Sequence, residues 1–446
     1  MDMPINPVWQ QHLFLGGWQS GDGQQMNVTE PATGDVLSRL KSATPADVER
    51  AANIASAAQK RWMDVPFDQK AEILRKAAAL PMQPSGQIFP SNMPGKRNYW
   101  KRIPIGTVGV IAPWNFPILL SMRSVFPALA MGNCVILKPD PKSAICGGVL
   151  MAQILEDAGL PEGVFHVLPG GPDVGEALVQ HPLVKMISFT GSTAVGKRIG
   201  ETCGRMLKKV ALELGGNNAQ VVLEDAELET ASSCGAWGSF LHQGQICMQT
   251  GRHLVHRSVA DEYIKRLAVR AGNLACGNPW QEQVQLGPLI NEAQAQRVED
   301  IVNRSVEMGA RIVVGGKRNG NYYDATVIAD VTPDMPVFSE EVFGPVAPVM
   351  AFDSDAEACD LVNDSPYGLA AAIHSGSTER ALKIANRIRV GMVHINDQTV
   401  NNEFQVPFGG MGSSGNSGRF GGPANIDEFT TSQWISVMEE GIRYPF

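Results

Sequence analysis

The sequence predicts an α/β protein built on a parallel sheet that helices cover on both faces. The first observation is an alternation between residues 108 and 213, where short, mostly apolar runs are separated by helical stretches. A second alternation of the same kind begins after Gly215-Gly216. The third observation is size: 446 residues with 44% hydrophobic residues can bury a large core and suggest two or three domains.

The first alternation gives the order of the elements in the first unit. We expect strands at 108–112, 135–138, 164–168, 186–189 and 210–213, and helices at 121–131, 143–158, 174–180 and 195–207. Ligands of such sheets bind at the carboxyl ends of the strands. Asn115, Lys138 and the turn at Gly191 all lie at or just past such ends, so this edge is the candidate binding site.

The rest of the chain is assigned from the same signals. Residues 1–46 look irregular and partly β, helices follow Thr44 and lie near 68–80, and 81–104 suggests a loop and a β-hairpin. In the second unit we expect helices at 228–241, 260–274, 292–308, 356–363 and 378–387, and strands at 253–256, 311–314, 347–351 and 392–395. Residues 409–422 form a glycine-rich loop, and 433–437 a final strand.

Bulk composition argues against several classes of protein. The net charge of -8 is spread without runs of one sign, which disfavours a nucleic-acid or membrane surface. No apolar run reaches the roughly 18 residues of a membrane span, and the N-terminus lacks the pattern of a signal peptide. The seven cysteines are scattered singly, so we expect a cytoplasmic protein with reduced thiols and no metal site.

Cys247 is the candidate nucleophile. It follows a Gln-Gly-Gln turn, with Phe240, Leu241, Ile246 and Met248 on either side. An arbitrary cysteine is usually a small buried hydrophobe, but here Gly244 allows a close backbone approach and the following N–H groups can point at an oxygen. A thiol also needs a lowered pKa to attack at neutral pH, and no cationic partner is visible in the sequence.

Other polar residues at the same edge have a plain and a functional interpretation. Glu213 ends an apolar strand, where it could cap a helix or pair with a base, or act as a general base with a pKa raised by apolar surroundings. Asn115 is either a turn former or an amide donor to an oxyanion. The turn from Gly191 through Ser192 to Gly196 is either a tight turn or a phosphate site, and Lys138 either a solvated lysine or a ribose ligand.

Taken together, these motifs resemble the aldehyde dehydrogenase superfamily along almost the whole chain. The stretches at 113–117, 189–192, 212–216, 244–247 and 341–345 occur in that family's order. Within the family, the stretches at 242–245, 394–398 and 443–446 look most like the bacterial benzaldehyde dehydrogenases.

The resemblance implies a role for each matching residue. Cys247 would be the nucleophile, its N–H and Asn115 would form the oxyanion hole, and Glu213 would activate the hydrolytic water. NAD would be held by Ile111, Pro113, Trp114, Lys138, Gly191, Ser192, Gly196, Leu214, Glu341 and Phe343, with Lys138 on the adenosine ribose and Glu341 on the nicotinamide ribose. The aldehyde would lie against Phe116, Phe240, Leu241, Ile246 and Met248.

The resemblance also implies an architecture. A Rossmann-type cofactor domain would comprise 1–87 and 107–213, an α/β catalytic domain 214–424, and a small β arm for homodimer or homotetramer assembly 88–106 and 430–446. Two departures stand out. Pro141 replaces a glutamate that the family often places near the ribose, which leaves NADP open beside NAD, and two helices of the family are expected to be missing near residue 79.

The leading hypothesis is therefore an enzyme that oxidises an aromatic aldehyde such as benzaldehyde to its acid. One alternative is a catalytically impaired protein of this fold with a structural or binding role, against which the intact Cys247, Glu213 and Asn115 argue. Another is a thiol hydrolase without cofactor, although no histidine–asparagine pair can be assigned to Cys247 from the sequence.

Overall fold

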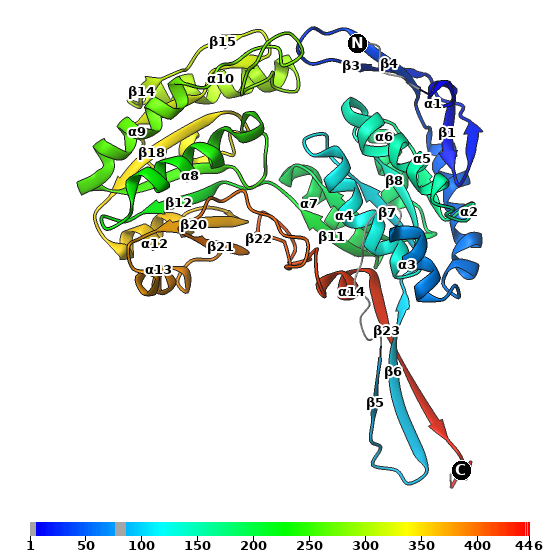
Figure 1. The fold of residues 1–446 in the computed structure, drawn as a ribbon. Coiled ribbons are helices and arrows are strands. Elements are labelled where there is room, and N and C mark those ends of the chain that lie inside the picture. Colours follow the sequence, from blue (N-terminus) through cyan, green and yellow to red (C-terminus); the bar gives the residue numbers. More distant parts are fainter. Residues whose placement is uncertain (1–5, 76–85, 442, 444) are drawn as a thin grey trace.

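The computed structural model describes residues 6–75, 86–441, 443, 445 and 446. Figure 1 shows two lobes, each built on its own sheet, and an arm that extends below the lobe containing the N-terminal half of the chain. Each lobe has a seven-stranded sheet, which confirms the predicted α/β class. The predicted loss of two helices near residue 79 falls outside the described residues.

The sheet of the first lobe has the strand order β11-β10-β7-β8-β9-β1-β2. Its parallel strands are β7 (Thr107–Ile111), β8 (Cys134–Lys138), β9 (Phe165–Val167), β10 (Val184–Thr190) and β11 (Lys209–Glu213), and β1 (His12–Leu15) and β2 (Trp18–Ser20) extend it antiparallel. All five predicted strands are present. β8 lies on one side of β7 and β10 on the other, so the strand order reverses at β7. In sheets of this kind, ligands bind at the carboxyl ends of the strands at such a point.

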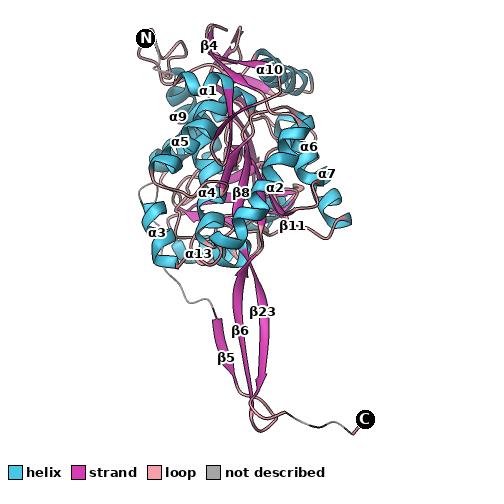
Figure 2. Ribbon diagram, turned by 90° about the vertical axis from the view of Figure 1, so that its right-hand side faces the viewer, coloured by secondary structure: helices cyan, strands magenta, loops and turns pink. Residues whose placement is uncertain are grey.

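Helices cover both faces of this sheet, as Figure 2 shows edge-on. They are α2 (Pro45–Trp62), α3 (Phe67–Arg75), α4 (Pro117–Ala130), α5 (Leu150–Asp157), α6 (Pro172–Gln180) and α7 (Thr193–Arg205). The single helix predicted at 143–158 is wrong in its first half, which is a 3₁₀ turn (Pro141–Ser143) followed by a π turn (Ile145–Val149). There the carbonyl of Gly147 accepts a hydrogen bond of 2.8 Å from the Ser121 hydroxyl, and a Cβ on Gly148 would lie 2.7 Å from Pro139.

The sheet of the second lobe has the order β14-β17-β18-β13-β12-β20-β21. Its strands are β12 (Asn218–Val222), β13 (Thr250–His256), β14 (Arg311–Val314), β17 (Thr326–Ala329), β18 (Val346–Phe352), β20 (Ala370–His374) and β21 (Met392–Ile395). Sequence analysis missed β12, β17 and β20. In β20 the run of three alanines favours a helix by intrinsic propensity, but the whole strand is buried and its position in the sheet decides its conformation.

Helices of the second lobe follow the prediction closely. They are α8 (Leu228–Phe240), α9 (Ala260–Gly272), α10 (Glu292–Glu307), α12 (Asp355–Asn363) and α13 (Thr378–Ala385). Short elements complete the fold: α1 (Pro7–Gln11), β3 (Gln25–Thr29), β4 (Val36–Lys41), β15 (Arg318–Asn319), β16 (Tyr322–Tyr323), α11 (Pro336–Ser339), β19 (Tyr367–Gly368), β22 (Met411–Gly412) and α14 (Ala424–Phe429).

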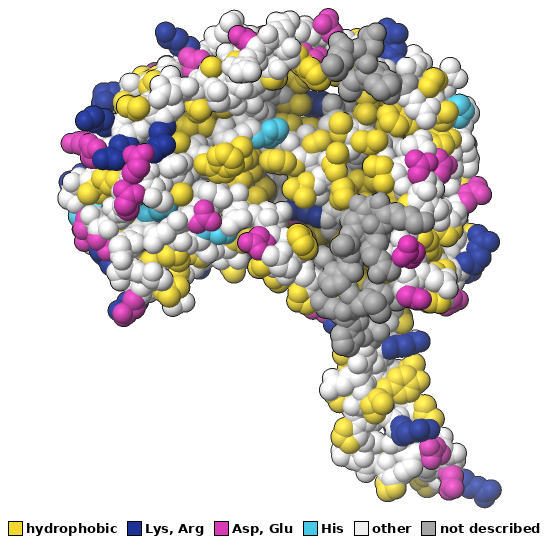
Figure 3. Space-filling view, in the orientation of Figure 1, with side chains coloured by type: hydrophobic (Ala, Val, Ile, Leu, Met, Phe, Trp, Pro, Cys, Tyr) yellow, Lys and Arg dark blue, Asp and Glu magenta, His cyan; other side chains and the backbone are white. Residues whose placement is uncertain are grey.

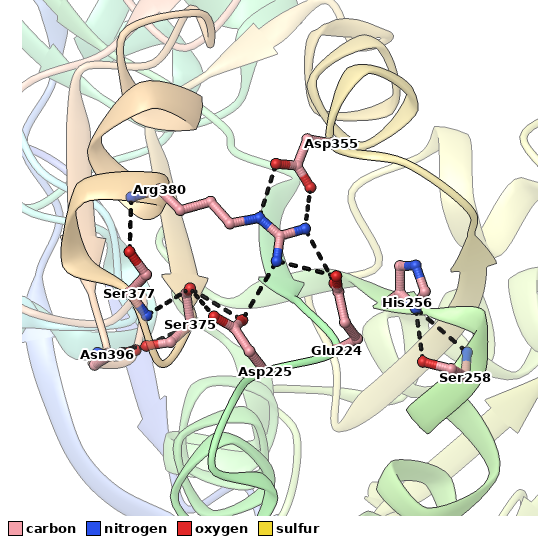
Figure 4. A network of polar contacts seen from close by, with 9 residues as sticks. All are labelled: Glu224, Asp225, His256, Ser258, Asp355, Ser375, Ser377, Arg380 and Asn396. Atoms are coloured by element: carbon pink, nitrogen blue, oxygen red, sulfur yellow. Dashed lines mark hydrogen bonds and ion pairs between the residues drawn. The ribbon is translucent and has the colours of Figure 1, made fainter.

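One arginine ties two of these helices to the end of β12. Arg380 of α13 donates from Nε to Asp355 at the start of α12, at 2.9 Å, and from Nη1 to Glu224 beyond β12, at 3.1 Å (Figure 4). Ser375 donates to Asp225 in the same network, at 3.0 Å. This polar network therefore joins the segments that follow β12 and β20 to the starts of α12 and α13.

The arm is a three-stranded antiparallel sheet of β5 (Gly86–Phe89), β6 (Lys96–Pro104) and β23 (Thr430–Met438). The predicted hairpin and the predicted last strand therefore pair with each other, and Figures 1 and 2 show them projecting from the body. At its base the Asn133 amide donates to the Phe429 carbonyl at 2.9 Å. In the part of the chain that the structure describes, no helix is long and apolar enough to cross a membrane.

Candidate active site

Glu213 stands at the carboxyl edge of the first sheet, where the two lobes meet. It is the last residue of β11 and pairs with Thr190, the last residue of β10. Its carbonyl accepts the Gly191 N–H at 3.1 Å, and its backbone also bridges to Gly415 in the glycine-rich loop. Backbone pairing on both sides therefore fixes the position from which this carboxyl group projects.

The carboxyl group of Glu213 is almost completely removed from solvent. The residue is 3% exposed, and its Oε1 has no hydrogen-bond partner among the described residues. Burial raises the pKa of Glu213 to about 8, although the positive charges of Arg123 and Arg419 act to lower it. A carboxyl group with a pKa close to physiological pH is suited to take up and release a proton.

The turn before Cys247 is built from three consecutive left-handed residues. His242 and Gln243 have φ of 53° and 55°, and Gly244 has φ of 68°. At Gly244 only glycine fits, since a Cβ there would lie 2.2 Å from the Gly344 carbonyl oxygen. The turn leads out of α8 and brings Cys247 towards the edge of the first sheet.

Side-chain amides hold the loop that carries Cys247. Asn218 donates to the carbonyls of Cys247 and Gln249, at 2.8 and 2.7 Å, and Asn115 donates to the carbonyl of Gln245 at 2.9 Å. A Cβ on Gly216 would lie 2.2 Å from the Cys247 carbonyl oxygen, so this glycine is required for the close approach. Sequence analysis found Asn115 and the glycine but not Asn218 or Gln249.

The thiol of Cys247 is surrounded by charged groups from three parts of the chain. Burial raises the pKa of Cys247 to about 12; Glu213 and Glu341 act in the same direction, while Arg123 and the N–H of Met248 oppose them. Arg123 is therefore the cation that sequence analysis did not find. The sequence did contain a signal for Arg123: it is the one charged residue in the apolar stretch 117–130 that follows Asn115.

Residues predicted to hold the nicotinamide end of the cofactor meet across the two lobes. The rings of Trp114 and Phe343 are in edge-to-face contact, with centroids 5.7 Å apart. Glu341 accepts the Gly216 N–H at 2.9 Å, and burial raises the pKa of Glu341 to about 7. The structure thus brings Glu341 and Phe343 of the second lobe to the edge that carries Trp114.

Residues predicted to hold the adenosine end lie along the strand ends of the first sheet. Lys138 is buried at the end of β8 beside Ile111 of β7, and its ammonium makes only a 3.4 Å contact with the Pro139 carbonyl. Burial lowers the pKa of Lys138. Such a donor, with no carboxylate in ion-pair distance among the described residues, is available to a ribose hydroxyl.

The start of α7 completes this edge. No side chain caps the helix at Ser192, and Gly196 packs so closely on Leu214 that a Cβ would lie 2.2 Å from a methyl carbon of that leucine. Free N–H groups at a helix start favour an anion. Together with Lys138, this donor set fits the phosphate and ribose groups of a dinucleotide.

The predicted substrate residues fall into two groups. Phe116, Leu241, Ile246 and Met248 belong to one hydrophobic cluster with Cys247, which also contains Phe408 and Leu369. Phe116 is also 4.8 Å from the His242 ring, centroid to centroid. Phe240 is instead packed into a separate core together with residues of α8 and α9.

Comparison with known proteins settles the family. The model of the aldehyde dehydrogenase family matches residues 18–84 and 78–435, which is nearly the whole chain. This chain belongs to the aldehyde dehydrogenase family. The resemblance stated from the sequence motifs is confirmed, and with it the fold that the family implies.

Two aldehyde dehydrogenases of aromatic substrates are similar to this one over their full length. The benzaldehyde dehydrogenase [NAD(+)] of Pseudomonas putida is 52% identical, with 99% of each chain covered. The vanillin dehydrogenase of an Amycolatopsis species is 47% identical, with 98% of each chain covered. The alignment with the Pseudomonas protein runs over 480 positions, which exceeds the 446 residues of this aldehyde dehydrogenase.

Solved structures of aldehyde dehydrogenases have the same fold as this chain. A salicylaldehyde dehydrogenase from Pseudomonas putida G7, complexed with salicylaldehyde, has a TM-score of 0.93 at 32% identity, covering 98% of this chain and 99% of that one. A betaine aldehyde dehydrogenase from Staphylococcus aureus, in complex with NAD+, has a TM-score of 0.93 at 27% identity, covering 98% and 97%.

Proposed function

We propose that this aldehyde dehydrogenase oxidises an aromatic aldehyde to the carboxylic acid with NAD+, through a thioester on Cys247. The observation that carries the proposal is the convergence of Cys247, Glu213 and Asn115 at one edge, next to the half-buried apolar side chains of Phe116 and Leu241. The similarity to benzaldehyde, vanillin and salicylaldehyde dehydrogenases supports the aromatic substrate.

In the first half of the reaction the thiol of Cys247 gives its proton to solvent water, and the resulting thiolate forms a bond to the carbonyl carbon. The carbonyl oxygen becomes an alkoxide, and the amide of Asn115 with the N–H of Cys247 stabilises its charge. When bound, NAD+ supplies the acceptor for the hydride that this carbon gives up. The product on the protein is a thioester of Cys247.

In the second half Glu213 acts as the base. Its carboxylate takes a proton from water, the water oxygen attacks the thioester carbon, and the carbon–sulfur bond breaks to release the acid and the Cys247 thiol. Because burial raises the pKa of Glu213 to about 8, this step is expected to speed up as the pH rises towards 8.

NAD is the proposed cofactor. Lys138, Gly191, Ser192 and Gly196 would hold its adenosine and phosphate groups, and Glu341 with Phe343 its nicotinamide end, beside Trp114 and Leu214. The residue at 141 is proline, so no carboxylate there would repel a 2′-phosphate, and NADP binding is a further outcome for the assay below.

For assembly we propose a homodimer or homotetramer formed through the arm. Large apolar side chains on the arm strands are exposed, with Ile88 at 80% and Trp434 at 71%, and Figure 3 shows hydrophobic side chains along this projection. An edge with exposed apolar side chains favours pairing with another chain. Proposed domain limits are 1–87 with 107–213, 214–424, and 88–106 with 430–446.

We also propose that the chain lacks two helices of the family and that the protein is cytoplasmic. The long alignment, and the break of the family match at 78–84, support the loss of about two helices there. The seven cysteines, scattered singly along the chain and free in the structure, support a cytoplasmic protein.

A spectrophotometric assay tests the proposed function. The purified protein is mixed with benzaldehyde and either NAD+ or NADP+, and the absorbance of the reduced cofactor is followed. We expect reduction of NAD+ with release of benzoate, and Cys247→Ala is the matched control. A protein that binds NAD+ but reduces none with any aryl aldehyde would support the alternative of a catalytically impaired protein of this fold.

A further inference from the structure

Arg123 places an unusual charge in the wall of the site. It lies on α4, and its Nη2 donates to the Thr190 hydroxyl at 2.8 Å. Its guanidinium carbon is 4.9 Å from the ring centre of Phe420 and 5.1 Å from that of Phe408. Its Nε is buried without a hydrogen-bond partner, and no carboxylate of the described residues lies within ion-pair distance.

Burying the Arg123 charge in this way costs free energy unless the charge interacts with another charged group. Removing a cation from water without a counterion is strongly unfavourable, comparable to what a buried ion pair loses when its partner is deleted. The two ring faces and the one hydrogen bond that the charged guanidinium group donates to Thr190 offset this cost only in part. A methionine would fill the same space against the rings at lower cost, so packing alone does not account for the arginine.

The geometry points this charge at the two reacting groups. Thr190, which accepts from Arg123, is paired with Glu213 on the neighbouring strand. Both Glu213 and Cys247 lie close enough to Arg123 for their charges to interact with it.

Among the described residues, the other charged groups near the site do not act on both Cys247 and Glu213. Cys247 is faced by Arg123, Glu213 and Glu341, of which only Arg123 is a cation. Glu213 is also faced by Arg419 from the glycine-rich loop and by Glu428 of α14, while Glu341 is faced by Arg297 of α10. Among the described residues, Arg123 is thus the one cation that acts on both the nucleophile and the base.

We propose that Arg123 is a positioning residue whose charge stabilises the thiolate of Cys247 and the carboxylate of Glu213. This rests on the proposed function, in which the first group must be an anion to attack and the second to activate water. Arg123 does this through charge and through Thr190, which sets the direction of its guanidinium group. Phe408 and Phe420 pack against its guanidinium group and help to hold it in place.

The test is the rate at which iodoacetamide alkylates Cys247 between about pH 7 and pH 10, a range below and around the ordinary thiol pKa. Peptide mass mapping separates Cys247 from the other six cysteines. We expect Arg123→Met to raise the pKa of Cys247 by about one unit, the lower end of the effect of a neighbouring opposite charge. The alkylation rate should then fall about tenfold at each pH below that pKa, and Arg123→Lys should restore most of it.

Phe420→Leu is the matched structural control, because it removes one of the two stacked rings and keeps the charge. We expect it to lower the melting temperature and leave the pH profile of alkylation in place. The proposal is overturned if Arg123→Met leaves that profile unchanged, or if Phe420→Leu shifts it as far as Arg123→Met does. A rise in KM for aldehyde with an unchanged alkylation profile also overturns it and makes Arg123 a substrate contact.

The alkylation reaction needs neither aldehyde nor cofactor. Failure of the proposed function therefore leaves this readout intact, and failure of the Arg123 proposal leaves the dehydrogenase assay intact. A second readout addresses Glu213: in Arg123→Met the rise of steady-state turnover with pH should move to higher pH, and in Arg123→Lys it should stay near that of the unmodified protein.

Discussion

The side-chain amide of Asn115 donates a 2.9 Å hydrogen bond to the carbonyl of Gln245, two residues before Cys247. This hydrogen bond joins the segment that follows β7 in the first lobe to the loop that carries Cys247 in the second lobe. It fixes the amide beside the loop that carries Cys247, and we propose that Asn115 has an oxyanion role in addition to this structural one.

Asn115→Ala separates these roles from simple turn formation. Removal of one oxyanion donor usually slows the chemical step by about 10² to 10³. We expect a loss of that size in the burst of reduced cofactor formed in the first turnover, measured by stopped flow. Asn115→Asp, which keeps the size but loses the N–H donor, should be comparably slow; a burst at the normal rate in either variant would leave Asn115 as a turn residue.

Glu213→Gln is expected to divide the two halves of the reaction. The first hydride transfer should persist as a burst of one equivalent per site, and steady-state turnover should collapse because no base activates water. Equal loss of burst and turnover would assign Glu213 to an earlier step.

The pH dependence of turnover follows from the pKa of about 8 for Glu213. The carboxylate is the active form, and it accumulates as the pH rises through that value, so turnover limited by hydrolysis should increase from pH 6 to about 9 and then level off. The slope should disappear in Glu213→Gln. A flat profile in the unmodified protein would mean that hydrolysis by this base is not rate-limiting.

Much of this site could be predicted from the sequence because its parts are local. Glu213, Asn115 and Lys138 lie just at strand ends, and the ends of parallel strands converge at one edge whatever the rest of the chain does. Arg123, Asn218 and Phe408 could not be placed in this way, since their contacts with the site span tens to hundreds of residues of chain.

The misplaced elements have a similar explanation. The helix expected at 143–158 opens into a π turn where Gly147 and Gly148 pack against Pro117 and Pro139 of other segments. Phe240 was expected in the substrate pocket because it is near Cys247 in the chain, but it packs into a separate core, and the three left-handed residues at 242–244 lie between the two. Neither packing nor backbone reversal has a reliable signal in hydrophobic periodicity.

Gly216→Ala tests whether the loop that carries Cys247 depends on its close contact with Gly216. The added Cβ would lie 2.2 Å from the Cys247 carbonyl oxygen, a backbone atom that cannot rotate away. We expect the loop to shift, with a loss of about 1–3 kcal/mol in the free energy of unfolding, as for other overpacked sites. The burst should fall as well. Gly204→Ala, on α7 with nothing within 4 Å of the added Cβ, is the control: it should leave the burst unchanged and, because alanine favours a helix over glycine, should not lower the free energy of unfolding.

The choice of substrate follows from the apolar cluster around Cys247. We propose that Phe116, Leu241 and Met248, which belong to this cluster, wall a narrow slot, where a flat ring would bury more apolar area than a short alkyl chain. We expect kcat/KM for benzaldehyde to exceed that for propanal by at least about tenfold, which corresponds to about 1.4 kcal/mol of transition-state binding. A panel in which propanal or acetaldehyde is the better substrate would contradict the aromatic assignment and leave the dehydrogenase assignment in place.

The covalent bond to Cys247 is tested most directly by trapping the thioester. Glu213→Gln is mixed with benzaldehyde and NAD+, quenched in acid within the burst, and its intact mass and peptides are measured. We expect one benzoyl group per chain, on the peptide that contains Cys247, and none when Cys247→Ala is added to the same variant. Reduced cofactor formed in the burst without any benzoyl group on Cys247 would contradict the account.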